Sequence, residues 1–123
     1  MPETTVVIGV SLNPVRHSYR TVAALHDLGH HVIALGSVAG EICGVKVQTG
    51  LPEVRKVHTV TMYLKPERQQ PYVDYILAMK PARLIFNKKT FNQELWDVAR
   101  ARGIHVMEAC TLVMIAKGIY PGD

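Results

Sequence analysis

The chain has 123 residues, of which 48% are hydrophobic and 20% are charged, and its formal net charge is +4 at pH 7. These values predict one globular domain over residues 1–123, and the absence of a long apolar run or a signal-like start predicts a cytoplasmic protein with no membrane partner. The basic residues are scattered along the sequence, which argues against a nucleic-acid partner.

Short apolar runs alternate with segments of helical periodicity, which is the pattern of repeated β-α units. The expected strands cover residues 5–10, 31–35, 59–64, 83–86 and 104–107. Residues 36–44 hold three glycines and no sustained period, so we expect a loop there. Together these elements predict an α/β fold of the doubly wound, Rossmann-like kind. Its mostly parallel five-stranded sheet would lie between two helical layers, with the first strand near the centre.

The first two helices follow the first and third expected strands. In the first helix Val22, Leu25 and Leu28 recur at three-residue spacing on one face, and Gly29 follows where a glycine commonly ends a helix. The second helix is expected over residues 67–79, because proline residues flank that stretch and are tolerated only in a first turn or beyond a helix end.

The third helix is expected to begin at a capping-box pattern, Thr90-x-x-Gln93, and to end at Gly103. Residues 110–116 are apolar enough to form a short helix or a tail that covers the sheet. No internal repeat or linker interrupts this order.

The most informative segment joins the first strand to the first helix. An apolar run breaks at Gly9 into a polar turn that carries Arg16 before the helical pattern begins. A strand, a tight turn and a helix start bring free backbone N–H groups and the positive end of the helix dipole to one point. Arg16 would add a planar, permanently charged donor. The segment therefore predicts a phosphate-binding turn over residues 9–19.

Ligands in such sheets bind at the carboxyl ends of the strands, where the strand order reverses. The segments expected to meet there are residues 9–19, 35–37, 63–66, 86–89 and 108–110. Two familiar nucleotide motifs are missing: G-x-G-x-x-G with an acidic residue closing the second strand, and the P-loop. Without the first motif, a nicotinamide dinucleotide is less favoured as the ligand. Without the P-loop, the sequence gives no support for ATP hydrolysis.

No catalytic constellation emerges from the residue pattern. There is no nucleophile elbow and no pair of carboxylates near a plausible nucleophile, and the histidines lack metal-ligand spacing. We therefore expect neither catalytic residues nor a metal site, and a chain that is non-catalytic by itself. Cys43 and Cys110 are isolated and far apart, which predicts reduced thiols.

The segment V-I-G-V-S-L-N-P-V-R-H-S-Y at residues 7–19 resembles the opening of stand-alone CoA-binding proteins, a family related to the nucleotide-fold domain of succinyl-CoA ligase α subunits. Weaker agreements are Tyr63-x-Lys65-Pro66 and the segment 106–110. The chain departs from the family at residues 35–37, where V-N-P is common, and at residues 87–89, where a Q-x-G turn is usual. The likeness covers nearly the whole chain.

The resemblance implies coenzyme A, or an acyl-CoA, as the cofactor, with its phosphates held by the turn and its nucleotide along the ends of the second and third strands. Lys88 and Lys89 are added on charge alone. The residues expected to bind the cofactor are Gly9, Val10, Ser11, Asn13, Arg16, Ser18, Tyr19, Leu35, Gly36, Ser37, Tyr63, Lys65, Pro66, Asn87 and Lys88.

Two other functions remain open at this point. One is a small enzyme that uses NAD(P) or another nucleotide, and the other is a subunit that completes an acyl-CoA enzyme in trans; a homodimer is also compatible with the pattern. Cys110 follows the last strand and is either a small buried residue or a thiol that forms a mixed disulfide with bound CoA.

Overall fold

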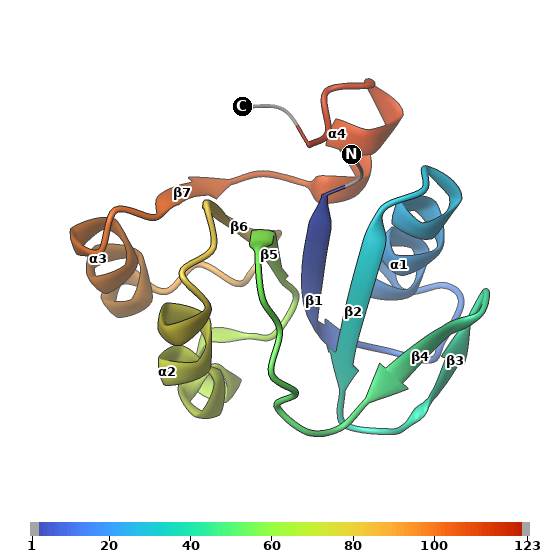
Figure 1. Ribbon diagram of the computed structural model, residues 1–123, viewed down its shortest axis with the longest axis horizontal. Helices are drawn as coiled ribbons and strands as arrows, with labels where there is room; N and C mark the ends of the chain where they lie inside the picture. The colour runs from blue at the N-terminus through green and yellow to red at the C-terminus, as the bar shows by residue number, and fades with distance from the viewer. Residues whose placement is uncertain (1–2, 122–123) are drawn as a thin grey trace.

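The computed structural model describes residues 3–121. Both ends of the expected domain therefore lie outside the described residues. They include Met1 and Pro2, which belong to the start that was considered for a signal peptide. The chain forms a seven-stranded sheet in the order β3-β4-β2-β1-β5-β6-β7, and helices cover both of its faces (Figure 1). The strands are β1 (Thr4–Val10), β2 (His31–Gly36), β3 (Gly40–Ile42), β4 (Val45–Gln48), β5 (Val57–Met62), β6 (Arg83–Phe86) and β7 (His105–Glu108).

The pairings are parallel except for β3, which runs antiparallel to β4 at the edge of the sheet. The helices are α1 (His17–Asp27), the 3-10 helix η1 (Pro66–Arg68), α2 (Gln70–Met79), α3 (Gln93–Ala101) and α4 (Thr111–Ala116). The expected Rossmann-like α/β fold is confirmed, and β1 lies in the middle of the sheet as expected.

The strand count was wrong, because the expected loop over residues 36–44 contains β3 and the turn of a hairpin, and β4 follows directly after it. The turn is Cys43-Gly44, and both residues have positive φ, 50° and 89°. Two such residues are what a tight hairpin turn with the right twist needs. A strand of three residues is too short to show an alternation of apolar and polar residues. The glycines of this segment therefore predicted a loop instead of a hairpin.

Alternation along β1 explains how one strand supports two helical layers. Val6 and Ile8 belong to the core under α2 and α3, whereas Val7 belongs to the core under α1 and α4. Val10 also belongs to the core under α1 and α4, because the register with β2 shifts between Ile8 and Val10. Val6, Val7 and Ile8 are completely buried. Successive side chains of a strand point to opposite faces, so a run without polar residues indicates a strand covered on both sides.

Two helix starts differ from the expected ones. The segment expected as one helix is split into η1 and α2 by Gln69, whose buried amide donates to the carbonyls of Leu64 (2.9 Å) and Thr90 (2.7 Å). The cap of α3 is Asn92, whose Oδ1 accepts from the N–H of Leu95 at 3.2 Å. The capping-box assignment was wrong, because the Thr90 hydroxyl donates instead to the Asn87 carbonyl at 2.8 Å.

Candidate functional site

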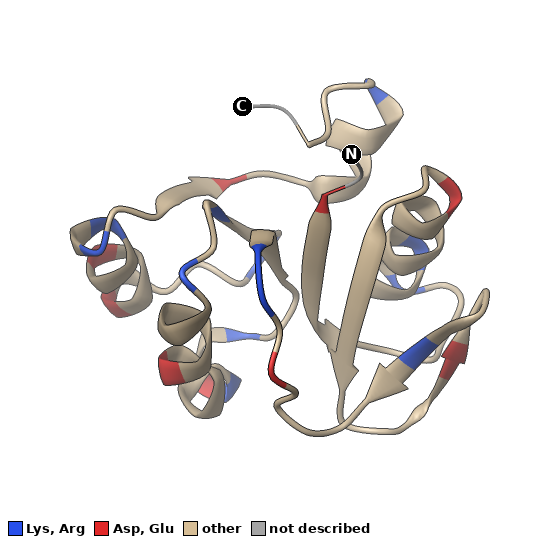
Figure 2. Cartoon of the chain, in the orientation of Figure 1, with Lys and Arg blue, Asp and Glu red and all other residues tan. Residues whose placement is uncertain are grey.

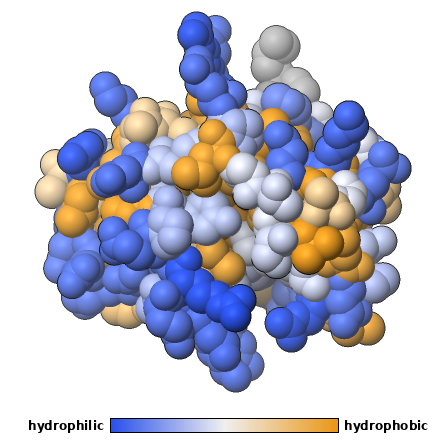
Figure 3. All heavy atoms as spheres, turned by 90° about the horizontal axis from the view of Figure 1, so that it is seen from below, coloured by the Kyte–Doolittle hydropathy of each residue, from blue (hydrophilic) through white to orange (hydrophobic). Residues whose placement is uncertain are grey.

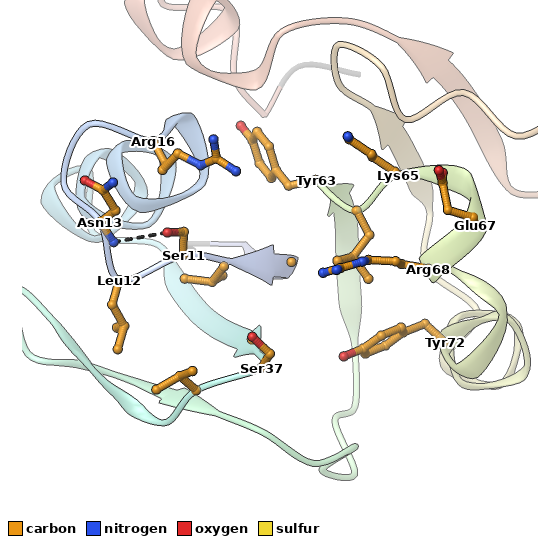
Figure 4. A pocket seen from close by; sticks show the side chains of 15 residues that line it. Ser11, Leu12, Asn13, Arg16, Ser37, Tyr63, Lys65, Glu67, Arg68 and Tyr72 are labelled. Carbon is orange, nitrogen blue, oxygen red and sulfur yellow. Dashed lines mark hydrogen bonds between the residues drawn. The ribbon is translucent and has the colours of Figure 1, made fainter.

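A cavity opens at the carboxyl ends of β1, β2 and β5, where β1 leads into α1 (Figure 4). It has a volume of about 1000 Å³, and a second cavity of about 510 Å³ shares part of its lining. Figure 3 looks onto this edge of the molecule, where hydrophilic side chains are interspersed with apolar patches. The residues common to both cavities are Gly9, Ser11, Arg16, Tyr63 and Lys65.

Two glycines let the backbones of neighbouring strand ends approach under this cavity. Gly9 has a φ of 93°, and a Cβ there would lie 2.9 Å from the backbone nitrogen of Leu64. A Cβ on Gly36 would lie 2.4 Å from the carbonyl oxygen of Val10. Because real Cβ atoms do not come so close to backbone, both positions require glycine. The floor of the cavity is therefore backbone rather than side chain.

The turn between β1 and α1 is held by its own hydrogen bonds. The N–H of Ser11 donates to the Ser18 hydroxyl (3.0 Å), and the N–H of Asn13 donates to the Ser11 hydroxyl (3.1 Å). The N–H of Val15 donates to Asn13 Oδ1 (3.1 Å), and the N–H of Arg16 donates to the Asn13 carbonyl (3.0 Å). These short-range bonds are those that Asn and Ser form in turns.

The start of α1 keeps donors for an anion after these bonds are formed. Arg16 occupies the N-cap position without a side-chain cap, and its guanidinium projects into the cavity in Figure 4. The N–H groups of the first helical turn, at residues 17–19, cannot bond within the helix. With the helix dipole they leave this end electrically positive.

Tyr63 forms the wall between the two cavities. Its hydroxyl is hydrogen-bonded to the Thr21 hydroxyl on α1, and its N–H donates to the Ile8 carbonyl at 2.8 Å. Burial raises the pKa of Tyr63 to about 12, and the hydrogen bond with Thr21 offsets part of that effect. The phenol is therefore a neutral, fixed group at neutral pH.

Positive charge dominates the lining of both cavities. The basic residues are Arg16, Lys65, Arg68, Lys88 and Lys89, and the only carboxylate among the lining residues is that of Glu67. Elsewhere in the described chain residues of both signs occur, as on α3, which carries Glu94, Asp97 and Arg100 (Figure 2). A concave surface with this imbalance attracts an anion of more than one charge.

The structure brings most of the residues predicted from the sequence to these cavities. Eleven of them line one or both, namely Gly9, Val10, Ser11, Asn13, Arg16, Ser18, Gly36, Ser37, Tyr63, Lys65 and Lys88. The other four, Tyr19, Leu35, Pro66 and Asn87, are not in either lining. Leu35 is completely buried in the core, and Tyr19 packs against the core beneath α1.

Asn87 has a structural role instead. Its side-chain nitrogen donates to the Thr61 hydroxyl (2.7 Å) and the Met62 carbonyl (2.9 Å), and its Oδ1 accepts from the N–H of Thr111 (2.9 Å). Its side chain thus joins β5, β6 and the start of α4. Cys110 precedes Thr111, is half-buried and lies outside both linings.

Sequence reasoning missed six residues that line the larger cavity, which are Leu12, Val38, Leu64, Glu67, Arg68 and Tyr72, and it did not single out Val15, His17 and Thr90 of the smaller one. Arg68 and Tyr72 are four residues apart, at the end of η1 and the start of α2. That spacing places two side chains on one side of a helical segment, so it was a usable signal once Pro66 had been identified as a helix start. Within residues 3–121 no cluster of potential metal ligands is present, and no helix is long and apolar enough to cross a membrane.

This fold and this site define a Rossmann-like α/β protein with a basic cavity at its strand ends. Residues 3–116 match the model of a family described as "CoA binding domain", and the chain belongs to that family.

Solved structures agree with this architecture. The chain is similar to an uncharacterized protein at 34% identity, with a TM-score of 0.92 and 98% and 99% of the two chains covered. A hypothetical protein from Pyrococcus horikoshii OT3 shares 21% identity, with a TM-score of 0.82 over 92% of this chain and 81% of that one. A "dinucleotide forming Acetyl-coenzyme A synthetase 1" from Ca. Korarchaeum cryptofilum shares 18% identity and a TM-score of 0.69, over 86% of this chain and 25% of that one.

Proposed function

We propose that the protein reversibly binds coenzyme A, or an acyl-CoA, in the two connected cavities, with the diphosphate at the start of α1. The family supports the ligand, and the observation that carries its placement is the Arg16 guanidinium, which projects into the cavity beside the unbonded N–H groups of the α1 first turn. A diphosphate there receives a charge-assisted pair from Arg16 and the positive end of the helix dipole.

The side chains of the turn add donors to this arrangement. The Ser11 hydroxyl accepts from the Asn13 N–H and keeps its own proton free to donate. The Asn13 amide accepts through Oδ1, which leaves its NH₂ group for the ligand. Both residues line the larger cavity, so two neutral donors flank the charged one.

The connected cavities provide room for an elongated ligand on both sides of the diphosphate. The larger cavity extends from β1 toward Ser37 and Tyr72, and the smaller one extends from Arg16 toward Lys88 and Thr90. Nucleotides in this class of sheet lie over the end of β2. We therefore assign the adenosine to the larger cavity and the pantetheine arm to the smaller one.

A nicotinamide dinucleotide is the main competing ligand. Sites of that kind place an acidic residue at the end of the second strand, where it binds the ribose hydroxyls. Here Gly36 and Ser37 occupy that position, and the carboxylate in the lining comes from Glu67 on η1. This strand end therefore lacks the carboxylate that accepts from two free ribose hydroxyls, and it does not repel a phosphate on the ribose.

Calorimetric titration tests the proposal. CoA and NADH are titrated into the wild type, R16A and R20A. Arg20 lies one turn further along α1, is exposed and is outside both linings. R20A therefore serves as a control that removes one positive charge from the same helix. We expect CoA to bind more tightly than NADH, and R16A to weaken CoA about tenfold or more, the value of a charged hydrogen bond. R20A should stay within about twofold of the wild type, because Arg20 is exposed to solvent and makes no part of either cavity. Equal affinity for the two ligands, or equal effects of R16A and R20A, would contradict the proposal.

A further inference from the structure

A second basic centre lies in the larger cavity, apart from the turn that carries Arg16. Figure 4 shows the Arg68 guanidinium projecting from η1 into the cavity, with the Tyr72 phenol beside it and Ser37 across from them at the end of β2. Arg16 and the turn lie on the other side of the same cavity (Figure 4). The ends of a bound nucleotide would thus meet two separate groups of donors.

Arg68 has no charged partner among the described residues. The one ion pair in residues 3–121 joins Arg55 to Glu53 on an exposed loop, and the neighbouring Glu67 does not pair with Arg68. The guanidinium also forms no side-chain hydrogen bond within the described part of the chain. An arginine in this state presents its full donor set to whatever enters the cavity.

The location of Arg68 indicates which part of a ligand it meets. In dinucleotide-binding sheets of this kind the adenosine ribose lies beside the end of the second strand, and in NADP sites an arginine nearby accommodates its 2′-phosphate. By analogy, an arginine at this place suits a ribose phosphate. Ser37 stands at this strand end and contributes a hydroxyl donor instead of a carboxylate. Coenzyme A carries such a phosphate on its ribose in addition to its diphosphate.

We infer that Arg68, with the Ser37 hydroxyl, binds the phosphate on the adenosine ribose and selects coenzyme A over its dephosphorylated form. This inference rests on the proposed function. Arg68 supplies charge-assisted hydrogen bonds to the phosphate, and Tyr72 borders the same space from the first turns of α2. Arg68 is therefore a specificity residue, distinct from the diphosphate contacts of Arg16.

Lys88 and Lys89 are the rival basic groups for this phosphate. They line the smaller cavity, which does not include Ser37 or Arg68. Tyr63 and Lys65 line both cavities and lie between them. Lys88 and Lys89 are therefore separated from the end of β2 by the position proposed for the diphosphate. A single ribose cannot place its phosphate at both ends of this arrangement.

The test is titration of CoA and dephospho-CoA into the wild type, R68A, K88A and R100A. Arg100 is an exposed arginine on α3 outside both cavities, so R100A controls for the loss of one positive charge. We expect the wild type to prefer CoA by about tenfold, and R68A to reduce that ratio to about twofold by weakening CoA and leaving dephospho-CoA nearly unchanged. R100A and K88A should keep the wild-type ratio.

The other outcomes are informative as well. Equal weakening of both ligands by R68A, or loss of the preference in K88A instead, overturns the inference. Wild-type protein that binds both ligands equally overturns the inference but not the proposed function. Wild-type protein that binds neither ligand overturns both. Thermal unfolding of each variant confirms that the compared proteins are folded.

Discussion

Gly36 offers the sharpest test of how the floor of the site is built. A Cβ at this position would lie 2.4 Å from the Val10 carbonyl oxygen and 3.2 Å from Val47 Cγ1. Side-chain carbons do not approach backbone closer than 3.0 Å, so β1 and β2 would have to separate by about 0.6 Å where Val10 pairs with Gly36. Those strands are the centre of the sheet, and a shift there affects both helical layers.

We expect G36A to lower the free energy of unfolding by about 2–3 kcal/mol, in the range of overpacked cores. For a chain of this size that corresponds to a melting temperature lower by about 8–12 °C. The matched control is G50A, because a Cβ on Gly50 would meet nothing within 4 Å. It should change stability by at most about 0.5 kcal/mol, or raise it slightly by restricting the unfolded chain. Urea and thermal unfolding of both variants give the comparison. If G36A unfolds within about 0.5 kcal/mol of G50A, the close approach of the two strands is not what requires glycine.

Two further predictions concern polar groups around the cavities. Because the pKa of Tyr63 is raised to about 12, the folded state holds this proton more tightly than the unfolded state, and the wild type should lose on the order of 2 kcal/mol of stability as pH rises from about 10 to about 12. Y63F cannot titrate, so its unfolding free energy should fall less over that window, and parallel profiles for the two proteins would contradict the burial argument. N87A removes three hydrogen bonds and leaves the buried N–H of Thr111 without its acceptor, so it should cost about 2–4 kcal/mol in urea unfolding. The exposed neighbour variant K88A should change stability by less than about 0.5 kcal/mol, and an equal effect of the two variants would refute the structural role of Asn87.

The sequence predicted features that depend on local chemistry. Gly29 and Gly103 follow the ends of α1 and α3 with positive φ, as glycines after helices commonly do. Short apolar runs identified five of the six parallel strands, and the runs in β1 and β6 are largely buried, as expected of strands covered on both faces. The position of β1 then followed from the handedness of crossover connections.

Features that depend on tertiary contacts were not visible in the sequence. Asn87 and Lys88 follow the same strand, yet Asn87 turns inward to bond α4 and Lys88 lines a cavity. Arg68 lines the cavity next to Gln69, whose amide between η1 and α2 donates to the carbonyls of Leu64 and Thr90, contacts that the residue order does not reveal. No pattern in the residue order distinguishes a side chain that points inward from its exposed neighbour in a loop.

The polar residues of the turn between β1 and α1 have a second role that the sequence did not reveal. They were expected to contact phosphate, and in the structure Ser11, Asn13 and Ser18 also accept N–H groups of the turn itself. A turn that satisfies its own amides keeps its shape without a ligand, which lowers the cost of ordering it on binding. The positive charge in the cavity comes from the Arg16 guanidinium, the first turn of α1 and, on the opposite wall, Arg68. If the proposed function is correct, we expect ligand choice to depend on these few groups around a turn that is held by its own hydrogen bonds.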